Sequence, residues 1–225
     1  MLIKRRVQAV LFDFDGVLAD TEHLHCDAFR AVAAHAGVPL SEHDYYQRYL
    51  GLPDRECLTA LFAAAGRRRT AVELAALLRR KREEFARRMP EAALYPGAAA
   101  ALRRLHEHFL LAIASGAFRE EIAPILERAH VATLFCAVIG ADDVHAGKPD
   151  PEPYLRALQA INAGQRRPIS PAACVVIEDA PLGIRAARAA GMQCIAVTTH
   201  HEPAALADAD AVIAAVSQLR AEDLM

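Results

Sequence analysis

The chain has 225 residues, of which 54% are hydrophobic, and its formal net charge at pH 7 is −2. This length and composition predict one large domain, or a core with a smaller insert, with enough apolar residues for a buried core. A net charge this close to zero gives no general attraction to nucleic acid or to membrane surfaces, so we expect neither as a partner. Two basic clusters, at residues 67–69 and 79–82, are typical of a solvated helix face and its connecting loop.

The five cysteines are an odd number, and no two of them form a Cys-x-x-Cys pair. We therefore expect neither disulfides nor a zinc knuckle. The apolar run after Lys4-Arg5-Arg6 stops at Asp13, which is too short for a signal peptide, and no later stretch approaches the length of a membrane span. These features together predict a soluble protein of the reducing cytoplasm.

Short, nearly continuous apolar runs alternate with segments of helical spacing, which is the pattern of a parallel sheet covered on both faces. The last predicted helix has Pro181 in its first turn and Gly191 just after its end, where these residues are preferred. The sequence thus predicts an α/β core with a Rossmann-like parallel sheet. The predicted strands are residues 7–12, 110–114, 136–139, 174–177, 194–197 and 211–214, and the predicted helices are 98–108, 122–129, 153–161 and 182–190.

About ninety residues separate the first two predicted strands, far more than one crossover helix needs. We expect the intervening segment to be helical throughout, with breaks at Gly- and Pro-containing turns. We therefore predict an α/β core formed by residues 1–19 and 91–225, with an inserted all-helical cap at 20–90. Two adjacent linkers would let the cap swing as a lid above an active cleft. The predicted cap helices are 23–36, 42–50, 54–65 and 71–88.

Two carboxylates, Asp13 and Asp15, follow the first apolar run at a spacing of two. That spacing puts both side chains on one face of a strand, and Gly16 lets the chain turn so that both can face one small cavity. Carboxylates held this close repel each other. The arrangement therefore indicates a metal ion, or a pair of groups with different protonation roles.

Three further predicted strands are followed by chemically useful residues. These are Ser115-Gly116, Lys148 in the loop at 147–149, and Glu178-Asp179. Each alone is compatible with an ordinary turn, a surface loop or a helix cap. Ligands in open α/β sheets bind outside the carboxyl ends of the strands, so all of these residues are expected at one edge of the sheet.

In these motifs the sequence resembles the haloacid dehalogenase-like hydrolases, and most of all the branch that contains phosphoglycolate phosphatase-like enzymes and β-phosphoglucomutase. The resemblance is carried by residues 12–22, which end in Asp20-Thr21-Glu22, and by residues 178–192. It extends over nearly the whole chain. It implies a Rossmann-like core with a helical cap, dependence on Mg²⁺, and phosphoryl transfer through an aspartyl phosphate.

The resemblance gives Asp13 the role of nucleophile, which attacks phosphorus. A carboxylate cannot approach a phosphate dianion unless charge is neutralised. Mg²⁺ would supply that charge, held by Asp13, Asp179 and the backbone carbonyl of Asp15, with Glu178 in or just behind this group of ligands. Lys148 would add a second positive charge and restrain the Asp13 carboxylate.

Proton transfer and phosphate binding complete the expected site. Asp15 would protonate the leaving oxygen and then take a proton from the incoming nucleophile. A true dehalogenase lacks a carboxylate at this position, so Asp15 favours phosphoryl transfer. The Ser115 hydroxyl, with the backbone at Gly116 and Ala117, would hold the transferring oxygens.

A phosphatase and a phosphosugar mutase would share this core. β-Phosphoglucomutases usually carry Ser-x-Ser-Lys-Asn after the second strand, whereas Ala117 and Phe118 stand here at the second Ser and the Lys. The usual cap arginine is also displaced by one residue, at Arg55. These departures favour a phosphatase that acts on a small phosphorylated metabolite.

Two cap residues keep the mutase open, because His25 and Lys81 resemble the histidine and lysine of mutase caps. His25 is equally compatible with a helix-face histidine, and Lys81 with a solvated lysine in a basic run. In a phosphatase, Arg55, Lys81 and Arg119 could still grip an anionic part of the substrate. A further alternative is a non-catalytic binding protein. Phosphoglycolate, sugar phosphates and nucleoside monophosphates are open as substrates, as are a monomer and a small homo-oligomer as assemblies.

Overall fold

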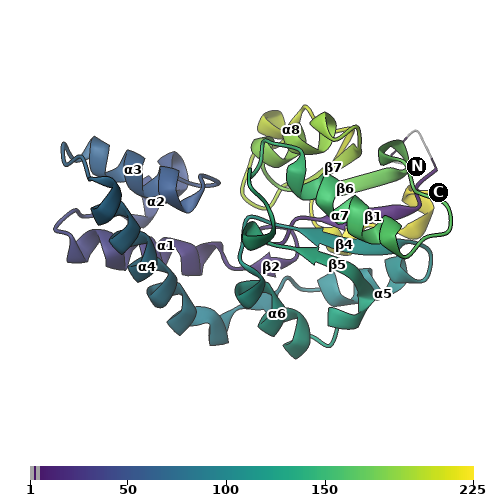
Figure 1. The fold of residues 1–225 in the computed structure, drawn as a ribbon, viewed down its shortest axis with the longest axis horizontal. Coiled ribbons are helices and arrows are strands. Elements are labelled where there is room, and N and C mark those ends of the chain that lie inside the picture. The colour runs from purple at the N-terminus through teal and green to yellow at the C-terminus, as the bar shows by residue number, and fades with distance from the viewer. Residues whose placement is uncertain (1–2, 4–5) are drawn as a thin grey trace. The chain divides into compact units, whose positions relative to one another are not determined.

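Six parallel strands form the central sheet, in the order β5-β4-β1-β6-β7-β8 (Figure 1). The computed structural model describes Ile3 and residues 6–225. Each of the six predicted strands is present, within a residue or two of its expected bounds. They are β1 (Ala9–Phe12), β4 (Leu110–Ala114), β5 (Phe135–Ile139), β6 (Cys174–Glu178), β7 (Gln193–Val197) and β8 (Ala211–Ile213).

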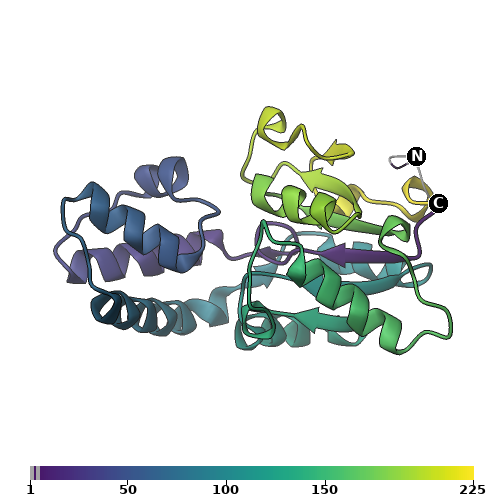
Figure 2. The same ribbon diagram turned by 45° about the horizontal axis from the view of Figure 1, so that its top comes forward.

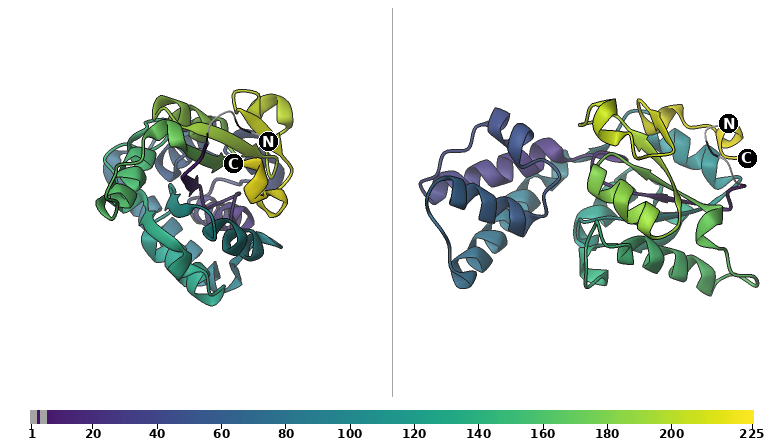
Figure 3. Two further views of the ribbon diagram at one scale, coloured as in Figure 1. Left: turned by 90° about the vertical axis from the view of Figure 1, so that its right-hand side faces the viewer. Right: turned by 90° about the horizontal axis from the view of Figure 1, so that it is seen from above.

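Helices cover both faces of this sheet (Figures 2 and 3). Two of them, α7 and α8, share one apolar core with alternate residues of the strands, including Leu11, Ala112 and Val176. The remaining strand residues point to the opposite face, because side chains alternate along a strand. The helices of this unit are α5 (Ala98–His106), α6 (Arg119–Arg128), α7 (Glu152–Ala163) and α8 (Pro181–Ala189).

Strand register brings the polar residues after the strands to one edge. Phe12 of β1 pairs with Ile113 of β4 on one side and with Ile177 of β6 on the other. The residues that follow these three positions therefore leave the sheet at the same level. The order of the strands reverses at β1, so this edge is also the switch point where ligands bind in open α/β sheets.

The chain divides into two compact units, Met1–Asp20 with Ala93–Met225, and Thr21–Ala92. A short antiparallel ribbon that sequence patterns did not predict lies where the α/β unit meets the insert in the chain. It pairs β2 (Ala19–Asp20) with β3 (Ala93–Leu94).

The second unit is helical, and each of its four predicted helices is present. The longest one begins with a capping box, in which the Thr70 hydroxyl accepts from the Glu73 amide and the Glu73 carboxylate accepts from the Thr70 amide. The unit has its own apolar core, which includes Phe29, Tyr45 and Leu58. Its helices are α1 (Glu22–His35), α2 (Glu42–Arg48), α3 (Asp54–Ala64) and α4 (Ala71–Arg88). Among the described residues, no helix combines the length and the apolar character needed to cross a membrane.

Candidate active site

Two strand ends and one loop place acidic and basic side chains together at the edge of the sheet. The Asp13 amide continues the β1–β6 ladder by donating to the Ile177 carbonyl at 2.9 Å. Lys148 reaches in from its loop, with its Nζ 2.8 Å from Asp13 Oδ1 and 2.7 Å from Glu178 Oε1. Oxygens of Asp13, Glu178 and Asp179 lie within 4.8 Å of one another. The structure therefore brings together four of the residues that the sequence singled out.

Glu178 is fully buried and both of its carboxylate oxygens accept hydrogen bonds. Oε1 accepts from Lys148 Nζ at 2.7 Å and from the Tyr154 hydroxyl at 2.6 Å. Oε2 accepts from the backbone amides of Asp179 at 3.0 Å and Ala180 at 3.2 Å. A buried carboxylate is tolerated only with such partners. Glu178 thus fixes the position of Lys148 and of the turn that carries Asp179.

Gly183, in the first turns of α8, is required by this arrangement. A Cβ at this position would lie 1.7 Å from Glu178 Oε1 and 2.4 Å from Oε2. The Glu178 carboxylate cannot retreat, because its donors come from three different elements.

We expect Gly183→Ala to destabilise the protein by about 1–3 kcal/mol, because the added methyl must displace Glu178. In an unobstructed helix the same change would be neutral or stabilising. Gly164→Ala is the matched control, since a Cβ at Gly164 would meet only the Ile161 carbonyl at 3.8 Å. Urea unfolding followed by circular dichroism measures both variants. Equal stability of the two would contradict the contact at Glu178.

The acidic groups of the site lack sufficient positive charge. Burial raises the pKa of Asp13 to about 7, and the charges of Glu178 and Asp15 add to the rise while Lys148 opposes it. Burial likewise raises the pKa of Asp179 to about 7, with further upward contributions from Glu178 and Asp13. Burial alone would lower the pKa of Lys148, but the charges of Asp13 and Glu178 outweigh it and raise that pKa.

These residues fit a hard divalent cation. Carboxylate oxygens from different strand ends converge at the distances such an ion bridges, and oxygen is the ligand atom that Mg²⁺ prefers. Gly16, at φ +75°, lets the turn after Asp13 come close to the Asp179 carboxylate. Any larger residue would clash, because a Cβ at Gly16 would lie 2.1 Å from Asp179 Oδ2. A divalent ion would also stabilise the ionised forms of the two aspartates, which burial and their acidic neighbours disfavour.

The loop after β4 holds Ser115, whose side chain is buried. Its amide donates to the Ile139 carbonyl at 3.0 Å, and its hydroxyl accepts from the Ala117 amide at 3.1 Å. The Ala117 amide is thus directed at Ser115 in this structure, whereas Gly116 has open space around it. The role of this loop in holding phosphoryl oxygens stays a prediction.

Arg119 is already paired with an acidic side chain, that of Asp143. Its guanidinium forms a two-pronged ion pair with Asp143, at 2.6 Å from Nε to Oδ2 and 2.9 Å from Nη2 to Oδ1. This pair connects the first residue of α6 to the segment after β5. A substrate contact by Arg119 stays a prediction, and it would have to compete with Asp143.

In the helical unit, the expectation that Lys81 could be a solvated lysine is wrong, because its side chain is only 1% exposed. Its Nζ lies 2.9 Å from Asp54 Oδ1 and 2.7 Å from His25 Nδ1, between the rings of Phe29 and Phe85. A lysine ammonium only donates, so His25 Nδ1 accepts. The positive charge of Lys81 is therefore paired inside its own unit.

Burial, with the charges of Lys81 and His23, lowers the pKa of His25 well below its usual value. The folded state then binds fewer protons than the unfolded state, so stability falls as pH drops below about 6.5. We expect His25→Asn to reduce this loss of stability at acid pH. Midpoints of urea unfolding between about pH 5 and 7.5 measure the loss, and His35→Asn, at an exposed histidine of the same helix, is the control. Parallel pH profiles for the wild type and His25→Asn would contradict the prediction.

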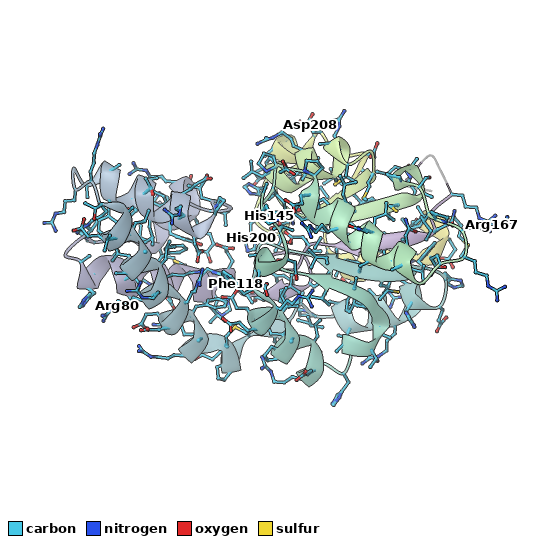
Figure 4. The ribbon with its side chains drawn as sticks, viewed as in Figure 1. Arg80, Phe118, His145, Arg167, His200 and Asp208 are labelled. Atoms are coloured by element: carbon cyan, nitrogen blue, oxygen red, sulfur yellow. The ribbon has the colours of Figure 1, made fainter. Side chains whose placement is uncertain are left out.

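Sequence reasoning missed two residues of the α/β unit. Tyr154 lies at core spacing in α7, and nothing in the sequence separates its hydroxyl contact with Glu178 from ordinary packing. His200, labelled in Figure 4, follows the end of β7, and its Nδ1 lies 3.2 Å from Asp179 Oδ2. A signal for His200 was available, because β7 ends at the same edge as the other strands.

Comparisons with known proteins place this site in a known family. The family model described as "haloacid dehalogenase-like hydrolase" matches residues 7–191. A phosphorylated carbohydrates phosphatase from Thermotoga maritima is 35% identical over 210 residues, covering 92% of this chain and 93% of that protein. A β-phosphoglucomutase from Bacillus subtilis is 31% identical over 198 residues, covering 85% and 83%.

A solved structure gives the same result for the fold. CbbY from Rhodobacter sphaeroides in complex with phosphate superposes with a TM-score of 0.79 at 28% identity, covering 97% of this chain and 99% of that one. The matched family region contains every residue of the carboxylate and lysine cluster. The chain therefore belongs to the haloacid dehalogenase-like hydrolases.

Proposed function

We propose that this enzyme is a Mg²⁺-dependent phosphatase that hydrolyses a small phosphate monoester through an aspartyl phosphate on Asp13. The observation that carries the proposal is the largely buried Asp13 carboxylate, held by Lys148 at 2.8 Å and flanked by Asp179. The Thermotoga relative acts on phosphorylated carbohydrates by its name, so a sugar phosphate is the first substrate class to test.

In the first half-reaction, a carboxylate oxygen of Asp13 attacks phosphorus and the ester P–O bond breaks. Asp15 gives its proton to the departing oxygen, so the alcohol leaves neutral. Lys148 restrains the attacking carboxylate and offsets its charge. The Ser115 hydroxyl and neighbouring amides bind the phosphoryl oxygens.

In the second half-reaction, Asp15 takes a proton from water, which attacks phosphorus and releases inorganic phosphate from Asp13. The residues that would hold Mg²⁺ are Asp13 and Asp179, with the Asp15 carbonyl, and Glu178 behind them. When bound, the ion neutralises charge between the Asp13 carboxylate and the phosphate dianion.

A mutase of the β-phosphoglucomutase type is the second candidate, favoured by the Bacillus relative and by the contact between His25 and Lys81. A mutase must grip a second phosphate with cationic groups of the cap. The pairing of Lys81 with Asp54 and of Arg119 with Asp143 counts against it, because both charges already have acidic partners.

The test is phosphate release from a broad panel of phosphorylated metabolites, with and without Mg²⁺, reported as kcat/KM. We expect Mg²⁺-dependent release from at least one sugar phosphate or phosphoglycolate-like ester. Interconversion of glucose 1- and 6-phosphates without phosphate release would establish the mutase. No turnover of p-nitrophenyl phosphate or of any panel member would favour a non-catalytic binding protein.

A further inference from the structure

We propose that His200 is a positioning residue that holds the Asp179 carboxylate in its metal-binding orientation and thereby sets the affinity for the divalent cation. This inference rests on the proposed function, because it assumes that Asp179 binds Mg²⁺. It concerns only the α/β unit. No motif of the sequence analysis included His200.

Strand order explains how His200 reaches Asp179. The strand β7 lies beside β6 in parallel register, with Ala196 paired to Glu178. The residues after β7 therefore leave the sheet next to the turn that carries Asp179. The Thr198 amide donates to the Ile213 carbonyl at 3.1 Å, which anchors the start of this loop to β8.

The contact itself is a hydrogen bond with a defined direction. His200 Nδ1 lies 3.2 Å from Asp179 Oδ2. A metal-binding Asp179 is an ionised carboxylate, which only accepts, so in that form Nδ1 carries the proton and donates. Both side chains are largely buried, at 15% and 11% exposed, so water competes little for this bond.

Gly16 packs against both members of the pair. A Cβ at Gly16 would lie 2.1 Å from Asp179 Oδ2 and 3.1 Å from His200 Nδ1. The turn after Asp13 thus closes over the hydrogen bond and leaves Asp179 little freedom to rotate. Asp13 directly precedes this turn and Asp15 lies within it, so the orientation of Asp179 is coupled to the orientations of these two residues.

The electrostatic surroundings show why Asp179 needs this partner. Oxygens of two other carboxylates, Glu178 and Asp13, lie within 4.8 Å of it, whereas His200 Nδ1 faces it as a hydrogen-bonding partner. Nδ1 is directed at the carboxylate, and the described residues whose side-chain ligand atoms could share one ion are Asp13, Glu178 and Asp179. His200 therefore acts behind a ligand rather than as one. Partners of this kind orient the ligand, and their loss typically lowers metal affinity about 10- to 100-fold.

The test is the Mg²⁺ dissociation constant, measured by isothermal titration calorimetry on metal-free protein at one fixed pH. His200→Leu removes the donor and keeps an apolar side chain of similar size. His200→Asn keeps an N–H donor close to the position of Nδ1. We expect His200→Leu to weaken Mg²⁺ binding about 10- to 100-fold, and His200→Asn to restore most of the affinity. His201→Leu, at the next residue, controls for disturbance of the loop and is expected to bind as the wild type does.

The outcomes separate this inference from the proposed function. If the wild type binds no Mg²⁺, or if Asp179→Asn binds it equally well, the proposed metal site is wrong. If the wild type binds Mg²⁺ and His200→Leu binds it as tightly, the inference is overturned while the proposed function stands. Equal weakening in His200→Leu and His200→Asn also overturns it, because the donated hydrogen bond would then not be the cause. Thermal unfolding of each metal-free variant checks the fold, and His200→Ala replaces His200→Leu if the latter does not fold.

Discussion

Asp13→Asn is expected to abolish phosphatase turnover, with a loss of at least about 10⁴-fold in kcat. The amide has nearly the shape of the carboxylate but lacks the charge and the nucleophilic oxygen that would form the acyl phosphate. Phosphate release with saturating Mg²⁺ and the best panel substrate measures the loss. Mass spectrometry of acid-quenched enzyme should find covalent phosphate on the wild type and none on the variant.

Stability distinguishes this loss from misfolding. Burial raises the pKa of Asp13 and so disfavours its ionised form in the metal-free protein, and Lys148 keeps Glu178 as a partner, so Asp13→Asn should fold at least as stably as the wild type without Mg²⁺. Asp27→Asn, at an exposed carboxylate paired with Arg30, should keep wild-type activity. Full activity in Asp13→Asn would refute the covalent mechanism.

The cluster was predictable from the sequence because its members follow apolar strands. The carboxyl ends of parallel strands lie at one edge of the sheet. Once the strands were recognised, Asp13 and Glu178-Asp179 were therefore expected to lie close together. Lys148 follows no strand directly. It was singled out as part of the loop after the third predicted strand, and its place between Asp13 and Glu178 depends on how that loop folds back over the edge.

Contacts that depend on packing between elements could not be predicted in the same way. Lys81 is one of four consecutive basic residues, and only the packing of α4 against its neighbours decides which of them turns inward. Tyr154 follows the spacing of an ordinary core residue, and its hydroxyl finds Glu178 only because α7 lies against the sheet. Asp54 stands next to the arginine that the sequence suggested, and its pairing with Lys81 emerges only in three dimensions.

Lys148→Met is expected to have the second largest effect, because it removes the counter-charge shared by Asp13 and Glu178 while nearly keeping the side chain's volume. Activity should fall by at least about 10²- to 10³-fold, the usual loss when one preorganised charge at a reacting group is removed. Breaking a buried ion pair by removing one partner costs about 3–5 kcal/mol, so metal-free Lys148→Met should also be less stable by about that amount near pH 8. Phosphate release and urea unfolding measure the two effects.

The stability loss should depend on pH in a direction that identifies its cause. Lys148 lowers the pKa of Asp13, so its removal moves that pKa upward from about 7. The folded variant then holds a proton that the unfolded chain releases near pH 4, and its stability falls as pH rises through this interval. The wild type shows the same fall only up to about pH 7, so the deficit of the variant should widen as the pH rises from 5 to 8. Arg156→Met, which breaks the more exposed pair with Glu152, should cost less than about 1 kcal/mol at either pH. A deficit in Lys148→Met that is equal at both pH values would mean that lost packing, rather than an uncompensated carboxylate, is responsible.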